Sequence, residues 1–179
     1  MKRAKKISTT LFLMLFTCII VNAQEKTTNN AYISFYSELD AIKAENFNVT
    51  SRLNMDTGTI VFTVPIKSFE FESAMMQKHF NQEDVMDSNK FSISKFKGSI
   101  ENFEAVTLTE NGTYPISITG DLTIKGVAKR TTQNGNLIVK DEIIELEFTF
   151  DLDRYFWGMK AKEGSVSKIL RVQLKSTYK

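Results

Sequence analysis

Apolar and polar residues alternate with a period of two along most of the chain. The alternation is typical of antiparallel strands that turn one face to a core and the other to water. Weaker alternation extends the pattern to about eight strands, which predicts an all-β protein. The clearest segments are residues 59–66, 116–124, 144–152 and 165–177, and the weaker ones are residues 31–36, 44–53, 92–103 and 127–132.

Turn residues separate several of these strands. Asp56-Thr57-Gly58, Asn111-Gly112 and Asn134-Gly135 each lie between alternating segments, where residues with positive φ suit hairpins. Sequential hairpins favour a closed up-and-down antiparallel β-barrel, because closure removes exposed sheet edges. An open sandwich is the alternative, and the pattern alone does not separate the two.

One short segment has helical spacing. Residues 72–80 place Met75, Met76, His79 and Phe80 at roughly i, i+3, i+4 positions, and Ser73 is a suitable N-cap. A second turn is predicted at residues 83–87. The sequence therefore predicts a short helical insertion in the barrel.

The N-terminal 23 residues resemble a secretory signal peptide. Four basic residues precede the apolar run 11–21, and Val21-Asn22-Ala23 suits cleavage before Gln24. The run is too short to span a membrane. A lipoprotein, acylated at Cys18, is the less favoured alternative because the apolar run continues beyond that residue. Residues 24–30 are polar and are expected to be a frayed start.

Removal of the signal peptide changes the charge and the cysteine content. The chain has 23 basic and 21 acidic residues, and the first 23 residues contain four of the basic ones. The mature part, residues 24–179, is therefore slightly acidic, which argues against a nucleic-acid partner. Its length suits a single domain, and it has no cysteine, because Cys18 is the only one. Its stability must come from the core, without disulfides.

The residue types give little support to catalysis or to a metal site. The mature part has one histidine and no thiol, so it has no histidine-activated cysteine and cannot build a typical zinc site. Glu83, Asp84 and Asp87 lack the spacing of a calcium loop and are interpreted as a solvated face. We expect no catalytic residue, no metal and no cofactor.

Apolar side chains of an unusual size and number lie between residues 62 and 96. They either fill a core or line a cavity, because a barrel of about eight strands can enclose one small ligand. Methionine suits a cavity wall because its thioether adapts to irregular shapes. His79 is a candidate for contact with a ligand head group, with simple packing as the alternative. The predicted wall consists of Phe62, Val64, Phe69, Phe71, Met75, Met76 and Phe80.

The segment 69–100, FEFESAMMQKHFNQEDVMDSNKFSISKFKGSI, resembles the signature of the YceI-like family of exported bacterial proteins. The matching positions include His79-Phe80, Lys90-Phe91 and Phe96-Lys97-Gly98, and a second matching stretch covers residues 120–129. The resemblance implies a lipocalin-like antiparallel barrel with a helical insertion and an apolar tunnel for an isoprenoid or fatty-acyl chain. This chain departs from the family pattern in its first strand and at Ser92-Ile93, so its ligand can differ.

The sequence thus predicts an exported, non-enzymatic protein, periplasmic or secreted, that sequesters or transports an amphipathic chain-like lipid. The alternative is an envelope structural or interaction module with a filled core and no ligand. Lipid hydrolysis is a third and weaker hypothesis. We expect no nucleic-acid partner and no stable membrane insertion. A homodimer is compatible with the sequence, although no residue argues for one.

Overall fold

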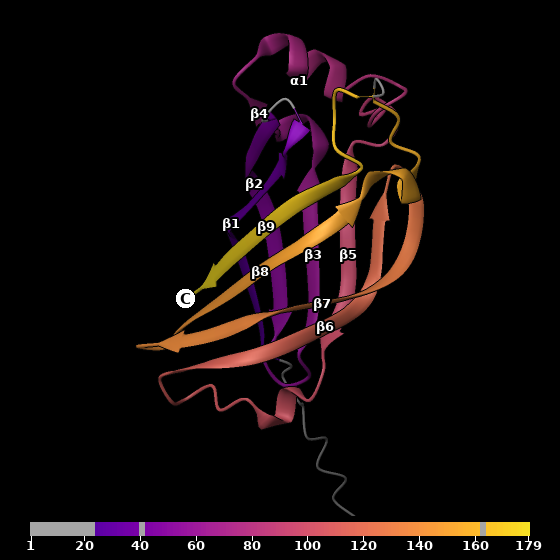
Figure 1. Ribbon diagram of the computed structural model, residues 1–179. Coiled ribbons are helices and arrows are strands. Elements are labelled where there is room, and N and C mark those ends of the chain that lie inside the picture. Colours follow the sequence, from indigo (N-terminus) through magenta and orange to yellow (C-terminus); the bar gives the residue numbers. More distant parts are fainter. Residues whose placement is uncertain (1–23, 40–41, 162–163) are drawn as a thin grey trace, which may run out of the picture.

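The computed structural model describes residues 24–39, 42–161 and 164–179. Eight antiparallel strands form a closed barrel in these ranges, because β1 pairs with both β2 and β9. Figure 1 shows the strands wrapping around a common interior. The predicted all-β, lipocalin-like barrel is therefore confirmed. The strands are β1 (Glu25–Ser37), β2 (Ile42–Asn54), β3 (Thr59–Pro65), β5 (Ile93–Ile100), β6 (Gly112–Ile124), β7 (Val127–Lys140), β8 (Ile143–Asp153) and β9 (Ile169–Tyr178).

The first strand starts earlier than the apolar pattern indicated. Residues 24–30 were expected to fray, and this expectation is wrong, because Glu25 pairs with Asn54 and Thr28 pairs with Ser51. Backbone hydrogen bonds to β2 hold this segment, and such bonds do not require apolar side chains. Only Thr28 in its first half has a buried side chain, which explains why hydropathy missed it.

The turn at Gly58 is confirmed, with φ +67°. The other two predicted hairpins are wrong. Asn111-Gly112 lies at the start of β6, after a long connection from β5 that contains the 3₁₀ turn η3 (Phe103–Ala105). Asn134-Gly135 lies within β7, and the hairpins on either side of β7 turn at Lys125-Gly126 and Asp141-Glu142, all with positive φ.

Gly135 has a packing role. A Cβ at this position would lie 2.3 Å from the Glu147 carbonyl oxygen and 2.3 Å from Cδ1 of Phe148. A glycine within a strand marks such a close approach. The glycine of the pair Asn134-Gly135 therefore leaves room for the inward-facing ring of Phe148, and the pair forms no turn.

One end of the barrel carries the helical insertion, which Figure 1 shows above the strand ends. The chain leaves β3 through η2 (Ile66–Ser68), forms β4 (Glu70–Phe71) beside β2, and enters helix α1 (Ala74–Phe80). Ser73 caps the helix as predicted, accepting a hydrogen bond from the Met76 amide at 3.5 Å. Residues 83–86 form turns.

The 3₁₀ turn η4 (Arg154–Trp157) lies between β8 and β9. None of the helices in the described ranges is long and apolar enough to cross a membrane.

The opposite end is closed by packed side chains. Leu53, Leu137 and Leu146 have no exposed surface there, and Tyr178 is 1 % exposed. The Tyr178 hydroxyl hydrogen-bonds to the buried hydroxyl of Ser51 and accepts a hydrogen bond from Ser176 at 3.3 Å. Burial raises the pKa of Tyr178 above its usual value. The cavity described below therefore lies toward the end that carries α1.

Gly135→Ala tests the packing role of this glycine. We expect a loss of about 1–3 kcal/mol of unfolding free energy in urea, because the added methyl overpacks against Phe148 and the β8 backbone. Gly112→Ala is the matched control, because the Cβ added at this position would lie 3.4 Å from the nearest atoms, which belong to the Tyr114 side chain. Equal stability of the two variants would contradict the packing role.

Tyr178 makes stability depend on alkaline pH. The folded pKa lies above the unfolded value of about 10, so the contribution of Tyr178 is complete below pH 10 and is lost as pH rises toward the folded pKa. We expect the unfolding free energy of the wild type to fall more steeply above pH 10 than that of Tyr178→Phe. If the unfolding free energies of the wild type and Tyr178→Phe, measured by urea titration, fell in parallel with pH, Tyr178 would not be the cause of the alkaline pH dependence.

Candidate functional site

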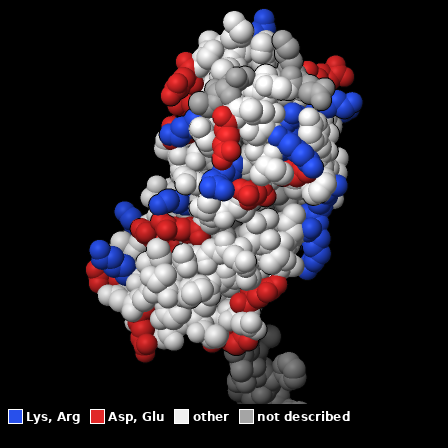
Figure 2. Space-filling view, viewed as in Figure 1, with Lys and Arg blue, Asp and Glu red and all other residues white. Residues whose placement is uncertain are grey.

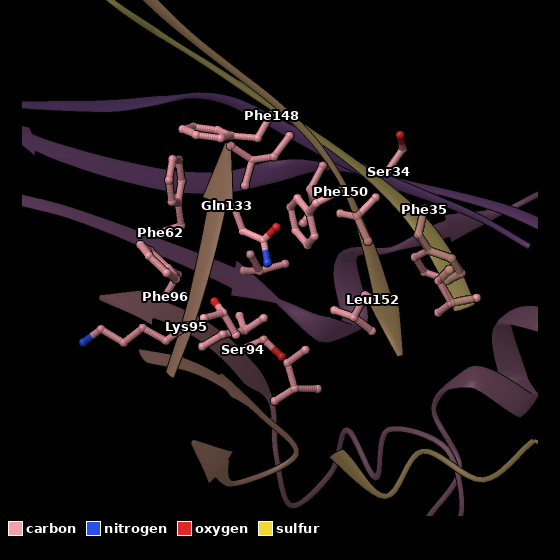
Figure 3. Close-up of a pocket in the computed structure, with 18 of the residues that line it drawn as sticks. Ser34, Phe35, Phe62, Ser94, Lys95, Phe96, Gln133, Phe148, Phe150 and Leu152 are labelled. Carbon is pink, nitrogen blue, oxygen red and sulfur yellow. The ribbon is translucent and has the colours of Figure 1, made fainter. Parts of the chain in front are cut away.

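The barrel encloses a cavity of about 120 Å³. Inward-facing residues of the strands form most of its wall, as expected from period-two alternation. Its volume approaches that of an engineered apolar cavity of about 150 Å³ that binds benzene. The filled-core alternative is therefore wrong for this part of the interior. The wall includes Phe62, Phe96, Ile118, Phe148, Phe150 and Val172, and Figure 3 shows several of these rings around the cavity.

A second hollow of about 440 Å³ lies next to this inner cavity, on the side of α1. We call it the vestibule. Its lining includes α1 residues on one side and Arg154, Ala161 and Val166 on the other. Phe35, Phe80, Met159 and Leu170 line both the vestibule and the inner cavity. These four side chains form the partition between the two spaces.

Aromatic contacts hold this partition. Phe35 and Phe80 stack with their ring centroids 5.7 Å apart, and Phe80 contacts Phe69 at 5.4 Å and Phe71 at 5.1 Å. Such pairs contribute about 0.5–1.5 kcal/mol each beyond the burial of their surface. Phe80 comes from α1 and Phe35 from β1, so the insertion and the barrel meet at this cluster.

The predicted wall residues divide between the two spaces. Phe62, Val64, Phe69 and Phe80 line the inner cavity. Three predicted wall residues, Phe71, Met75 and Met76, line only the vestibule, and so does His79, the predicted head-group contact. That these residues bind a ligand stays a prediction. The structure divides them into an inner set, which lines the inner cavity, and an outer set, which lines only the vestibule, and hydropathy did not distinguish the two sets.

Three of the outer residues differ from the sequence-based interpretation. Met75 is 66 % exposed and Met76 is 36 % exposed, because α1 has no buried residue. His79 is also exposed, so it does not pack in the core. These side chains border the opening of the vestibule and do not form a deep wall.

Sequence reasoning missed Arg154. This residue is 3 % exposed, and its guanidinium donates hydrogen bonds to the carbonyls of Met159 at 2.8 Å, Ser167 at 3.0 Å and Val166 at 3.3 Å. Within the described ranges no carboxylate forms an ion pair with it. Arg154 therefore holds the connection between η4 and β9 in place along the vestibule wall. A buried arginine in a turn has no hydropathy signal, and only the fold brings these carbonyls together.

The wall residues of the later strands were also missed as cavity residues. Ile118, Leu122, Phe148 and Phe150 had been recognised as apolar positions of alternating strands, which suits core and cavity equally. No signal in a single strand distinguishes the two, because the empty space lies between strands far apart in the chain.

The face of the molecule drawn in Figure 2 has no field of one charge. Figure 2 shows basic and acidic side chains interspersed over the visible face. Nucleic-acid-binding proteins usually gather basic residues on one face. The expected absence of a nucleic-acid partner stays a prediction. Among the residues that the structure describes, no group of three or more His, Cys, Asp or Glu side chains is arranged to hold a metal ion.

Comparison with known proteins bears on the family. The family model of the YceI-like domain matches residues 25–178, which include every strand of the barrel. The chain belongs to the YceI-like family. The recognition made from the segment 69–100 is thereby confirmed. A comparison with curated proteins gives no match.

Solved structures share this YceI-like fold at low sequence identity. Burkholderia cenocepacia BcnA is 16 % identical with a TM-score of 0.70, and the match covers 82 % of this chain and 95 % of BcnA. A polyisoprenoid-binding domain from Saccharophagus degradans is 9 % identical with a TM-score of 0.75, covering 88 % and 98 %. The Campylobacter jejuni YceI protein is 14 % identical with a TM-score of 0.55, covering 100 % and 99 %. At these identities the likeness supports the fold alone.

Arg154→Met tests the role of this residue at the vestibule. Because the three carbonyls lose their donors, we expect amide hydrogen exchange within residues 159–167 to speed up by about tenfold or more. Exchange in β6 and β7 should stay unchanged. Arg171→Met is the control, since the Arg171 side chain is 63 % exposed. Unchanged exchange in 159–167 would show that Arg154 does not hold this connection.

Proposed function

We propose that this protein is a non-enzymatic binding protein that holds an amphipathic chain-like lipid, isoprenoid or fatty acyl, for sequestration or transport. The observation that carries the proposal is the apolar inner cavity, which shares Phe35, Phe80, Met159 and Leu170 with the wider and largely apolar vestibule beside it. Membership of the YceI-like family and the fold shared with a polyisoprenoid-binding domain support the same class of ligand.

Solvent exclusion supplies the binding energy. Each methylene transferred from water into an apolar site contributes about 0.8 kcal/mol, so a chain needs few polar contacts. A cavity of 120 Å³ takes only a short part of such a chain. The rest of the lipid chain therefore lies in the vestibule, or the rings of Phe35 and Phe80 rotate to widen the passage between the vestibule and the inner cavity.

The location follows from the same proposal. The proposed carrier works in the aqueous compartment outside the cytoplasmic membrane, because the N-terminal 23 residues are predicted to be a signal peptide. Residues 1–23, on which that prediction depends, lie outside the described residues. Export to the periplasm or the medium is therefore part of the proposal, as is the absence of catalysis.

Solvent extraction of the purified protein, followed by lipid mass spectrometry, tests the proposal. We expect a chain-like lipid to co-purify with the wild type and to be reduced about tenfold or more in Ile118→Trp, whose indole would fill the inner cavity. Asp121→Trp is the matched control, because this residue lies on the same strand with an exposed side chain. Both variants must show a cooperative thermal transition.

Binding of a fluorescent fatty acid, cis-parinaric acid, gives a second measurement that does not depend on the lipid available during expression. The wild type and Asp121→Trp should bind it, and Ile118→Trp should bind it at least about tenfold more weakly. Absence of both co-purified lipid and probe binding in the wild type would overturn the proposed function.

A further inference from the structure

Polar side chains interrupt the apolar wall of the inner cavity at a few positions. Ser94 on β5 and Thr131 and Gln133 on β7 line it. Lys95 and Ser34 border it as well, but Figure 3 shows the ammonium group of Lys95 and the hydroxyl of Ser34 directed away from it. The polar groups that remain available inside are two hydroxyls and one amide, all uncharged.

These groups have no hydrogen-bond partner among the residues that the structure describes. The Oγ of Ser94 and the Oγ1 of Thr131 are shielded from solvent, and neither has a hydrogen-bond partner among the described residues. Ser94 as a whole is 7 % exposed. Only one other buried side-chain atom in the described ranges, Oδ1 of Asn81, is left unpaired. Buried polar groups in native proteins are nearly always satisfied, so two unpaired hydroxyls on one cavity need an explanation.

Thr131 and Gln133 form the centre of this polar region. They are two residues apart on β7, so their side chains project from the same face of the strand. Thr131 pairs with Gly120 of β6, which has no side chain to cover the hydroxyl. Figure 3 shows the Gln133 amide inside the cavity among the rings of Phe62, Phe148 and Phe150. No hydrogen bond joins this amide to another described group, although it offers both donors and an acceptor.

We propose that Thr131 and Gln133, with Ser94 as a second contact, form an internal polar site for a neutral hydrogen-bonding group of the bound lipid, such as an alcohol, a ketone or an amide. The inference rests on the proposed function and specifies its ligand. This internal site selects against a carboxylate or phosphate, because the described groups that face the cavity carry no positive charge and a buried unpaired charge is costly. A fatty acid such as cis-parinaric acid is therefore expected to enter chain first and to keep its carboxylate outside the inner cavity.

The site also sets the direction of the ligand. The polar group enters first and reaches β7, and the apolar chain extends back past Phe35 and Phe80 into the vestibule. The exposed His79 at the vestibule then meets the distal part of the chain and does not hold this polar group. The expected head-group role of His79 and the internal site are thus two separable predictions.

Four compounds with the same eight-carbon chain test the site, namely octane, 1-octanol, 2-octanone and octanoate at pH 8. Their affinities are measured by displacement of cis-parinaric acid from the wild type and from Thr131→Val/Gln133→Leu. The cost of removing each compound from water is the same for the wild type and for the double variant. The change in the affinity ratio of two compounds between the two proteins therefore reports only their contacts with the substituted side chains. Thr132→Val is the control, because its side chain is exposed and bonds to Thr119 at 2.7 Å outside the cavity.

We expect the ratio of octanol to octane affinity to fall about tenfold or more in the double variant, with octane affinity kept or increased. The control should keep the wild-type ratio, and Ser94→Ala should lower it by a smaller factor. The melting temperature of the double variant should stay the same or rise, since apolar isosteres replace unpaired polar groups.

Three results would overturn the inference. The first is an octanol-to-octane ratio that is equal in the wild type and the double variant, which would leave the proposed lipid binding intact. The second is a fall in the octanoate-to-octane affinity ratio of the double variant as large as the fall for octanol, which would show that the site also holds a charged group. The third is failure of every compound, octane included, to displace the probe from the wild type, which would remove the proposed function together with the internal site.

Discussion

The closure of one antiparallel sheet is the constraint on which the other features of this protein depend. β1 pairs with β2 on one side and with β9 on the other, so none of the eight long strands is left at an edge. Closure turns one face of every strand inward. A closed sheet of this size has an interior that side chains can just fill, and here they leave part of it empty.

The distribution of packing along the barrel explains where that empty space lies. At the end opposite α1, fully buried leucines and the Tyr178–Ser51 contact occupy the interior. Toward α1 the inward residues include several large rings together with aliphatic side chains, and these do not fill the interior completely. The insertion then covers this end, with Phe80 against Phe35, while Arg154 holds the opposite wall. An apolar space covered at this end results from these two attachments.

Several parts of this arrangement were predictable from local sequence. The strands with strong alternation, the helix cap at Ser73 and the turn at Gly58 all follow from short-range patterns, and the structure confirms them. The failures also have physical reasons. Asn134-Gly135 was taken for a turn, but the glycine makes room for Phe148 on the neighbouring strand. Residues 24–30 were taken for a frayed end, but β2 supplies their hydrogen bonds.

The amino-acid sequence by itself determined the all-β class, the closed barrel as the favoured arrangement, the helical insertion and the family. These properties depend on periodicity and on motifs contiguous in the chain. Only the tertiary structure decided which apolar side chains line the inner cavity and that Met75 and His79 lie outside it. It also decided that Ser94 and Thr131 face this cavity without a hydrogen-bond partner among the described residues. The reason is that empty space and unpaired polar atoms are properties of several strands together, and each strand alone shows the same inward alternation.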